Sequence, residues 1–172
     1  MTAALLLLGR IPGVSRPAIF TTVSLEKSVV GLLDIGANAD CRPNYLQQFG
    51  IMGSIYVREI LGCENPRVGL LSIGEEPHKG NELTRIAHKM LSKTAGIRFV
   101  GNVEGRDLFS GTADVIVTDG FTGNIVLKLA EGEALEIFGW IRKAVKSTVM
   151  ARIGGWFVRP ALRKVARRLD PS

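Results

Sequence analysis

The sequence predicts an α/β domain built on a mostly parallel sheet, and three observations lead to this prediction. First, short apolar runs alternate along the chain with longer stretches of helical periodicity. Second, the runs Val29–Ile35 and Arg67–Ile73 are almost continuously apolar, as strands buried on both faces of a parallel sheet are. Third, the spacing leaves room for helices between strands, which is typical of right-handed crossovers.

The chain opens with an apolar segment, Ala3 to Leu8, that predicts a core helix ending near Gly9. No basic segment precedes it, and Arg10 and Pro12 follow in place of a cleavage site, so we expect no signal peptide. An opening in mid-helix also suggests a piece of a longer protein.

The remaining elements follow from local signals. Pro43 opens a helical stretch and Gly62 ends it, as these residues commonly do. The predicted strands are Ala18–Val23, Val29–Ile35, Arg67–Ile73, Ile97–Val100 and Asp114–Thr118. The predicted helices are Tyr45–Leu61, Gly80–Lys93 and Thr122–Thr148.

Composition limits the class of protein. The 172 residues are 46% hydrophobic and 22% charged, which excludes a disordered or collagen-like chain. Two cysteines, Cys41 and Cys63, are too few for a metal cage or a disulfide framework and fit a reduced, cytosolic protein. No apolar run reaches the ~18–20 residues that a membrane-spanning helix needs.

Charge divides the chain into two predicted domains. The net charge of the whole chain is +6, but residues 1–136 carry −2 and residues 137–172 carry +8. We therefore expect a partial α/β domain over 1–136 and basic amphipathic helices over 137–172. A local basic excess indicates the kind of partner rather than the fold.

The basic segment has the pattern of a helical tip at the C-terminal end. Gly154-Gly155 is expected to interrupt its helix and Pro160 to restart it. Apolar residues and a basic face suit contact with an anionic membrane surface, and a dimer interface with a basic rim is the alternative. Nucleic acid is not expected, because the aromatic residues are not interleaved as stacking platforms. The residues predicted for membrane or interface contact are Ile153, Trp156, Phe157, Arg163, Lys164, Arg167 and Arg168.

Four loops that follow predicted strands carry the candidate chemistry. Each combines Gly or Asn with carboxylates, and the carboxyl ends of parallel strands meet at one edge of a sheet, where ligands bind. Any one such loop also fits a simple turn or helix cap. The candidates are Asp34, Gly36, Asn38 and Asp40; Glu75, Lys79, Gly80 and Asn81; Asn102 and Glu104; and Asp119, Gly120, Phe121, Thr122, Gly123 and Asn124.

The turn from Asp119 to Asn124 joins a strand directly to a helix. Free amides and the helix dipole at such a point bind phosphate-sized anions, and Lys128 lies one helical turn further on the same face. The standard nucleotide-binding glycine patterns are absent from the sequence. We therefore predict a phosphate at residues 120–124, supported by Lys128 or Lys79.

Other chemistry stays open at these loops. The acidic residues could hold a divalent metal, or they could cap helices and pair with Arg42, Lys79 or Arg106, and we expect no metal and no cofactor. Cys41 could be a nucleophile, although a small buried thiol is the more usual role. His78 could donate a proton, whereas His88 is expected to be a surface residue.

Three long stretches resemble the phosphate acyltransferase PlsX family. They read GLLDIGANADCRPNYLQQFGIMGSIYVREILG, NPRVGLLSIGEEPHKGNEL and FVGNVEGRDLFSGTADVIVTDGFTGNIVLKLAEG, and the likeness extends over nearly the whole chain. The resemblance implies a three-layer α/β/α fold related to isocitrate and isopropylmalate dehydrogenases and to phosphotransacetylases. It also implies that the chain is a central fragment, since the family's opening D-x-M-G-G-D and closing G-H-G segments are missing.

The resemblance implies an activity as well. The family transfers an acyl group from acyl-carrier protein to inorganic phosphate, and the next acyltransferase moves that group to glycerol 3-phosphate. Its members are homodimers that contact the membrane peripherally. Among the loop residues we assign catalytic roles to Lys79, Asn81, Asn124 and Lys128. The alternatives are a metal- and nicotinamide-dependent dehydrogenase of the related fold and a non-catalytic membrane-binding module.

Overall fold

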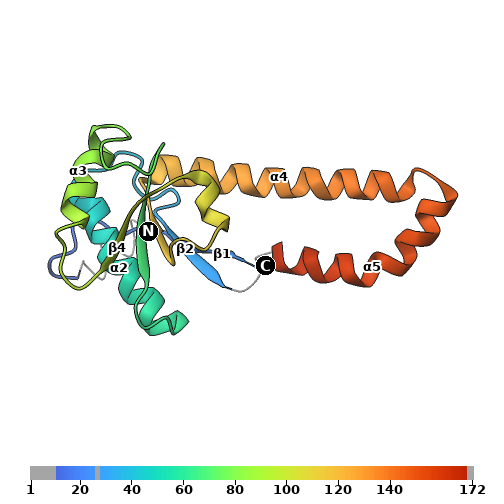
Figure 1. The fold of residues 1–172 in the computed structure, drawn as a ribbon, viewed down its shortest axis with the longest axis horizontal. Helices are drawn as coiled ribbons and strands as arrows, with labels where there is room; N and C mark the ends of the chain where they lie inside the picture. Colours follow the sequence, from blue (N-terminus) through green and yellow to red (C-terminus); the bar gives the residue numbers. More distant parts are fainter. Residues whose placement is uncertain (1–10, 26–27, 170–172) are drawn as a thin grey trace. The chain divides into compact units, whose positions relative to one another are not determined.

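The computed structural model describes residues 11–25 and 28–169 (Figure 1). The helix predicted over Ala3 to Leu8 lies outside the described residues. The chain divides into two compact units, Met1–Ile125 and Val126–Ser172, which are described separately below.

The first unit is organised around a five-stranded sheet. Its strands are β1 (Phe20–Ser24), β2 (Val29–Leu33), β3 (Arg67–Leu71), β4 (Arg98–Val103) and β5 (Val115–Val117). They are ordered β1-β2-β5-β3-β4. The edge strand β1 is antiparallel to β2, and every other pair is parallel. The predicted mostly parallel sheet is therefore confirmed.

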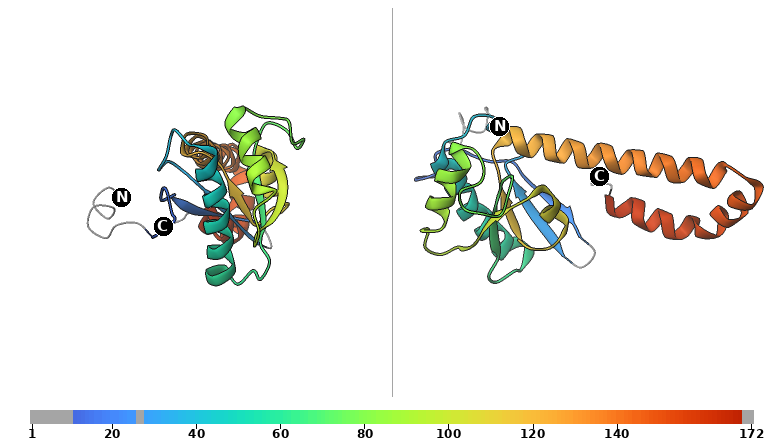
Figure 2. Two further views of the ribbon diagram at one scale, coloured as in Figure 1. Left: turned by 90° about the vertical axis from the view of Figure 1, so that its left-hand side faces the viewer. Right: turned by 45° about the horizontal axis from the view of Figure 1, so that its top comes forward.

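Two helices, α2 (Pro43–Leu61) and α3 (Glu82–Leu91), pack beside each other on one face of this sheet (Figure 2). The helix α2 contacts β2, β3 and β5. Gly53 allows a close approach, because a Cβ built there would lie 2.6 Å from Cγ1 of Val115. The core on this face consists of Leu33, Leu46, Phe49, Val57, Val68, Leu70, Ala87, Leu91, Val115 and Val117.

The chain returns from β4 to β5 across the other face. On β3, Gly69 points away from its core neighbours Val68 and Leu70, and a Cβ built on it would meet side-chain atoms of Val103 and Ala113. The 3-10 helix η1 (Gly105–Phe109) lies in this connection. Strands therefore stand between helical connections on both faces, which confirms the predicted three-layer α/β class.

The second unit consists of helical residues. The helix α4 (Gly120–Lys146) begins in the first unit and continues into the second, and α5 (Val149–Leu169) follows it. The predicted domain boundary after residue 136 lies inside α4.

The predicted break at Gly154-Gly155 is wrong, because α5 runs through these residues and through Pro160. A single glycine costs a helix only about 1 kcal/mol relative to alanine. Gly155 has a packing role instead, since a Cβ built there would overlap Cγ1 of Val145 on α4. Among the residues that the structure describes, no helix is both long and apolar enough to cross a membrane.

Candidate functional site

The loop after β2 is organised by one buried carboxylate, that of Asp34. Five N–H donors point at it. Its Oδ1 accepts the backbone N–H groups of Ile19, Gly36 and Ala37 at 3.1, 3.3 and 2.9 Å. Its Oδ2 accepts both the backbone N–H and the side-chain amide of Asn38 at 2.8 Å. Because a carboxylate offers about four lone-pair sites, Asp34 is occupied in shaping the loop.

The same loop is joined to the first turn of α4. The backbone N–H of Gly120 donates to the carbonyl of Asn38 at 2.8 Å. A Cβ built on Gly120 would lie 2.8 Å from that backbone, and one built on Gly123 would overlap the carbonyl oxygen of Asp34. Both positions therefore require glycine for a close approach between helix and loop.

Asn124 completes this junction. A Cβ built on Gly36, whose φ is 137°, would lie 3.7 Å from Oδ1 of Asn124. Asn124 and Phe121 are exposed, and Phe121 retains 63% of its accessible surface. The structure thus brings the loops after β2 and β5 together, with an exposed amide and an exposed aromatic ring beside them.

Three of the amides at the start of α4, those of Gly120, Thr122 and Gly123, already have partners in the chain. Oδ1 of Asp119 accepts the backbone N–H of Thr122 at 2.9 Å, and Oδ2 accepts its hydroxyl at 2.7 Å. The backbone N–H of Gly123 donates to the carbonyl of Asp119 at 2.9 Å. Asp119 is therefore the N-cap of α4, and its carboxylate occupies the place where we predict phosphate. Phosphate binding at residues 120–124 stays a prediction. It requires the Asp119 carboxylate to give up its hydrogen bonds to Thr122.

A second group of loops follows β3 and β4, which pair with each other. The carbonyl of Glu76 accepts the backbone N–H of Lys79 at 3.0 Å and the side-chain amide of Asn102 at 2.8 Å. The hydroxyl of Ser72 donates to the carbonyl of Lys79 at 3.4 Å. The backbone of Lys79 is therefore held on both sides, while its side chain is exposed.

Gly80 and Asn81 end this loop. Gly80 has a φ of 97°, a conformation that favours glycine, and a Cβ there would overlap Oγ1 of Thr84. Oδ1 of Asn81 accepts the backbone N–H of Thr84 at 2.9 Å, which makes Asn81 the N-cap of α3. The helix therefore begins at Glu82 rather than at Gly80.

The strand β4 is longer than predicted and includes Asn102, which lies opposite Leu70 of β3. Asn102 is 6% exposed, so the prediction of a loop position for its amide is wrong. Its Oδ1 lies 2.9 Å from Nδ1 of His88, whose ring makes an edge contact with Phe99. His88 is thus part of this network, whereas the sequence predicted a surface residue. Only the pairing of α3 with β4 could have revealed it.

The charged residues of this second group mostly pair among themselves. Arg106 contacts Glu104 at 3.0 Å and Glu75 at 3.7 Å. Glu104 and Asp107 form a reciprocal capping box at η1. Lys128, in the second unit, pairs with Glu131 at 3.0 Å. Among the described residues, no group of three or more His, Cys, Asp or Glu side chains is placed to hold a metal ion.

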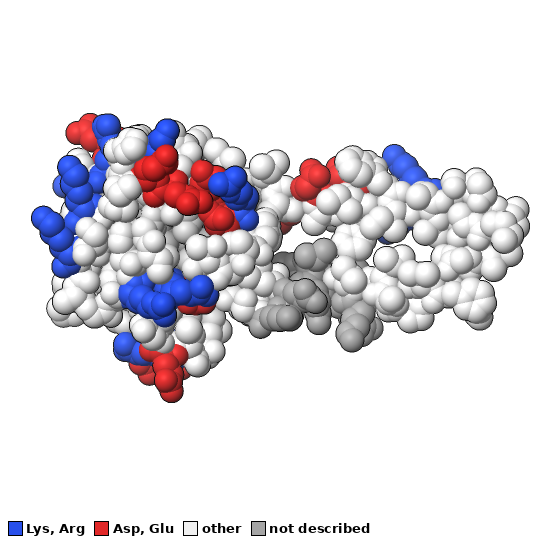
Figure 3. Space-filling model, in the orientation of Figure 1, with Lys and Arg blue, Asp and Glu red and all other residues white. Residues whose placement is uncertain are grey.

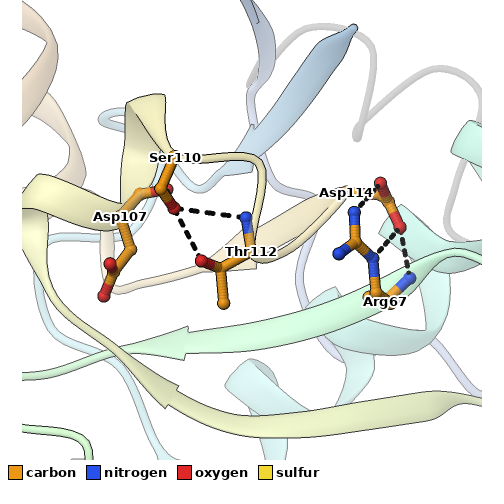
Figure 4. Close-up of polar contacts among 5 residues, drawn as sticks. All are labelled: Arg67, Asp107, Ser110, Thr112 and Asp114. Atoms are coloured by element: carbon orange, nitrogen blue, oxygen red, sulfur yellow. Dashed lines mark hydrogen bonds and ion pairs between the residues drawn. The ribbon is translucent and has the colours of Figure 1, made fainter.

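A partly buried ion pair joins the start of β3 to the residue that precedes β5 (Figure 4). Arg67, the first residue of β3, donates from Nε and Nη2 to the two carboxylate oxygens of Asp114, both at 2.9 Å. Its backbone N–H also donates to Asp114, at 2.8 Å. These hydrogen bonds lower the pKa of Asp114 below its ordinary value of 3.8. Next to it, the hydroxyls of Ser110 and Thr112 are 2.6 Å apart.

Cys41 lies beside the first group of loops, and its thiol donates to the carbonyl of Asn38 at 3.4 Å. Burial, with the nearby charges of Asp119, Asp34 and Asp40, raises the pKa of this thiol to about 11. The thiolate is the reactive form of cysteine, so this environment disfavours a nucleophilic role. Asp40 and His78 are both exposed.

Comparison with known proteins places the chain in a family. A family model described as "Fatty acid synthesis protein" matches residues 1–172. The chain belongs to this family. It is 52% identical over 174 residues to a phosphate acyltransferase of Deinococcus radiodurans, covering all of this chain and 48% of that protein. It is 54% identical over 172 residues to a phosphate acyltransferase of Thermus thermophilus, covering all of this chain and 52% of that protein. The chain thus spans about half the length of these relatives.

The fold also has a relative among solved structures. A phosphotransacetylase, EutD from Staphylococcus aureus, superposes with a TM-score of 0.61 over 76% of this chain and 46% of that chain, at 20% identity. This likeness confirms the predicted phosphotransacetylase-related fold. The family match favours acyltransferases over the dehydrogenase alternative.

Proposed function

We propose that this chain supplies the phosphate- and acyl-binding edge of an enzyme that transfers a fatty acyl group from acyl-carrier protein to inorganic phosphate. The product would be acyl phosphate for phospholipid synthesis, consumed by a glycerol-3-phosphate acyltransferase. The match of the whole chain to phosphate acyltransferases carries this proposal. The two groups of polar loops at the carboxyl edge of a parallel sheet supply a place for the reaction.

The proposed reaction needs no protein nucleophile. A phosphate oxygen attacks the thioester carbonyl carbon, a C–O bond forms, the C–S bond breaks, and the carrier thiolate leaves and takes up a proton. The protein has to position phosphate and stabilise the oxyanion, for which one hydrogen-bond donor is typically worth ~10²–10³ in rate. A largely protonated Cys41 is compatible with this route.

Two exposed side chains fit the polar roles. Lys79 stands on a turn whose backbone is fixed on both sides, so its ammonium group can meet an anion or the leaving thiolate. Asn124 lies beside Gly36 in the loop after β2, and its exposed amide can donate to phosphate or to the oxyanion. The side-chain oxygen of Asn81 caps α3 and the side-chain NH₂ of Asn102 tethers Glu76, and a catalytic role for Asn81 stays a prediction.

The test of the activity is acyl phosphate formation from acyl-carrier protein and phosphate. It should be run on this chain extended at both ends with the segments that longer relatives carry, beside the 172-residue chain. We expect turnover by the extended protein and at least a ~10-fold loss of kcat/KM in its Asn124→Ala variant. A folded extended protein with no turnover would contradict the proposal.

The helices of the second unit are proposed to form a homodimer and to contact an anionic membrane peripherally. Their large apolar side chains are exposed: Leu135, Trp156 and Phe157 retain 74%, 69% and 70% of their surface. Basic residues such as Arg159 and Arg163 lie on α5, the helix that also carries Trp156 and Phe157. The predicted contact residues Lys164, Arg167 and Arg168 are among the side chains that the structure does not describe.

Vesicle flotation and sedimentation test these associations. We expect binding to vesicles that contain anionic lipid, little binding to neutral vesicles, and loss of binding in a Trp156→Ser/Phe157→Ser variant. A concentration-dependent dimer in sedimentation would support the homodimer. Equal binding to neutral and anionic vesicles would contradict the electrostatic part of the proposal.

A further inference from the structure

A chain of hydrogen bonds crosses three separate segments next to the proposed site. It starts at His88 in α3, passes through Asn102 in β4 and ends at the carbonyl of Glu76 in the loop after β3. The distances are 2.9 Å from Nδ1 of His88 to Oδ1 of Asn102 and 2.8 Å from Nδ2 of Asn102 to the Glu76 oxygen. In sequence, Asn102 lies 14 positions from His88 and 26 positions from Glu76, so only the fold brings these residues together.

The donor and acceptor in each of these hydrogen bonds follow from the carbonyl of Glu76, at which the series ends. A backbone carbonyl can only accept, so the side-chain NH₂ group of Asn102 must donate to Glu76. The amide oxygen of Asn102 therefore faces His88 and must accept. Nδ1 of His88 then carries a hydrogen, and in the neutral ring Nε2 is the nitrogen without one.

The last acceptor in this series of hydrogen bonds, the carbonyl of Glu76, is also bonded to the backbone of Lys79. The Glu76 oxygen that accepts from Asn102 also accepts the backbone N–H of Lys79 at 3.0 Å. Asn102 is 6% exposed, so water has little access to replace its hydrogen bonds. Loss of the tether would free the turn that presents the Lys79 side chain.

We infer that His88 is a positioning residue, whose Nδ1–H acts through the side chain of Asn102 to fix the turn that carries Lys79. Its effect on acyl transfer rests on the proposed function, whereas its effect on the turn does not. The inference assigns a role to a histidine that has no place in the reaction steps above.

Two matched variants separate this hydrogen bond from the bulk of the ring. The amide nitrogen of Asn stands at the position of the histidine Nδ1, and that of Gln stands at the position of Nε2. His88→Asn therefore keeps the donor to Asn102, whereas His88→Gln removes it. Both variants lose the ring contact with Phe99, so that loss cancels in the comparison.

Hydrogen exchange and NMR on the 172-residue chain test the tether directly. We expect the Lys79 amide to exchange ~2- to 10-fold faster in His88→Gln than in His88→Asn. In the unmodified chain, ¹⁵N NMR of the neutral His88 ring should show hydrogen on Nδ1. Hydrogen on Nε2, or equal Lys79 exchange in the two variants, would overturn the inference.

The extended protein tests the consequence for catalysis. We expect kcat to fall at least ~10-fold in His88→Gln, with KM for phosphate changed less than about twofold, and to be largely retained in His88→Asn. An equal loss of kcat in both variants would overturn the positioning role. If the unmodified extended protein forms no acyl phosphate, the proposed function fails, and exchange and NMR still decide the tether.

Discussion

The two units of the chain differ in the side chains that characterise them. In the first unit, polar and charged groups of the loops bond to one another: Asp34 accepts five hydrogen bonds, and Asp119 and Asn81 cap helices. In the second unit, large apolar side chains such as Trp156 and Phe157 stand in solvent. The face in Figure 3 shows acidic and basic side chains interspersed over the first unit and mainly uncharged ones over the helices.

The two units therefore differ in the source of their stability. The first unit carries its own buried core, and its loops are fixed from within. Apolar side chains that stay exposed to water contribute little to the stability of the second unit, and exposed apolar faces mark sites of association. We therefore propose that the first unit carries the chemistry and the second unit the association.

The largest expected change in stability comes from a substitution of Gly123, where α4 meets the loop after β2. Gly123→Ala would drive a Cβ into the carbonyl of Asp34, which belongs to backbone and cannot rotate away, so we expect a loss of about 3 kcal/mol in the free energy of unfolding. Chemical denaturation followed by far-UV circular dichroism measures this free energy.

The matched control is Gly132→Ala, further along the same helix, where a Cβ would meet nothing within 4 Å. It should gain up to about 1 kcal/mol through helix propensity. Equal effects of the two substitutions would show that helix and loop do not meet as closely as described.

The next effect concerns the ion pair between Arg67 and Asp114. Because Arg67 lowers the pKa of Asp114 in the folded state, the stabilisation is present above the ordinary pKa of 3.8 and is lost as the pH falls through the lower, folded value. We expect the free energy of unfolding to drop by about 1.5 kcal/mol in this range. In Asp114→Asn this pH-dependent part should vanish, and an unchanged pH profile would contradict the assignment.

A smaller effect is expected inside the second unit. Gly155→Ala would press on Cγ1 of Val145, a side chain that can shift, so we expect the contact between α4 and α5 to weaken by about 1 kcal/mol. Hydrogen exchange of α5 should become faster. Gly154→Ala, where a Cβ meets nothing within 4 Å, should not speed exchange, and if it does so equally, the packing role of Gly155 is wrong.

The smallest expected effect is that of Cys41→Ala on acyl transfer. Since the pKa of this thiol is about 11, its thiolate is scarce at neutral pH, and we expect kcat of the extended protein to change less than about threefold. A loss beyond ~100-fold in a variant that remains folded would restore the nucleophilic role.

The sequence predicted the strands and the edge at which their loops meet, because continuous apolar runs and terminal glycines are local signals. It did not predict how the loops use their polar groups. Asn81 and Asp119 look like ligand donors until the start of each helix is known, since a cap and a ligand site need the same side chains.

Two further errors have a common physical cause. His88 and Asn102 are connected by packing of α3 beside β4, which no local pattern reports. Gly155 has the appearance of a helix breaker, but its missing side chain makes room for Val145 of another helix. In both cases tertiary contacts outweigh local propensity.

One paired measurement tests the division of roles most directly. Acyl phosphate formation and vesicle binding should be measured together on the extended protein, on its Asn124→Ala variant and on its Trp156→Ser/Phe157→Ser variant. We expect Asn124→Ala to lose at least ~10-fold in kcat/KM and to bind vesicles normally, and the double variant to keep its turnover and lose vesicle binding. The reverse pattern would contradict this division of roles.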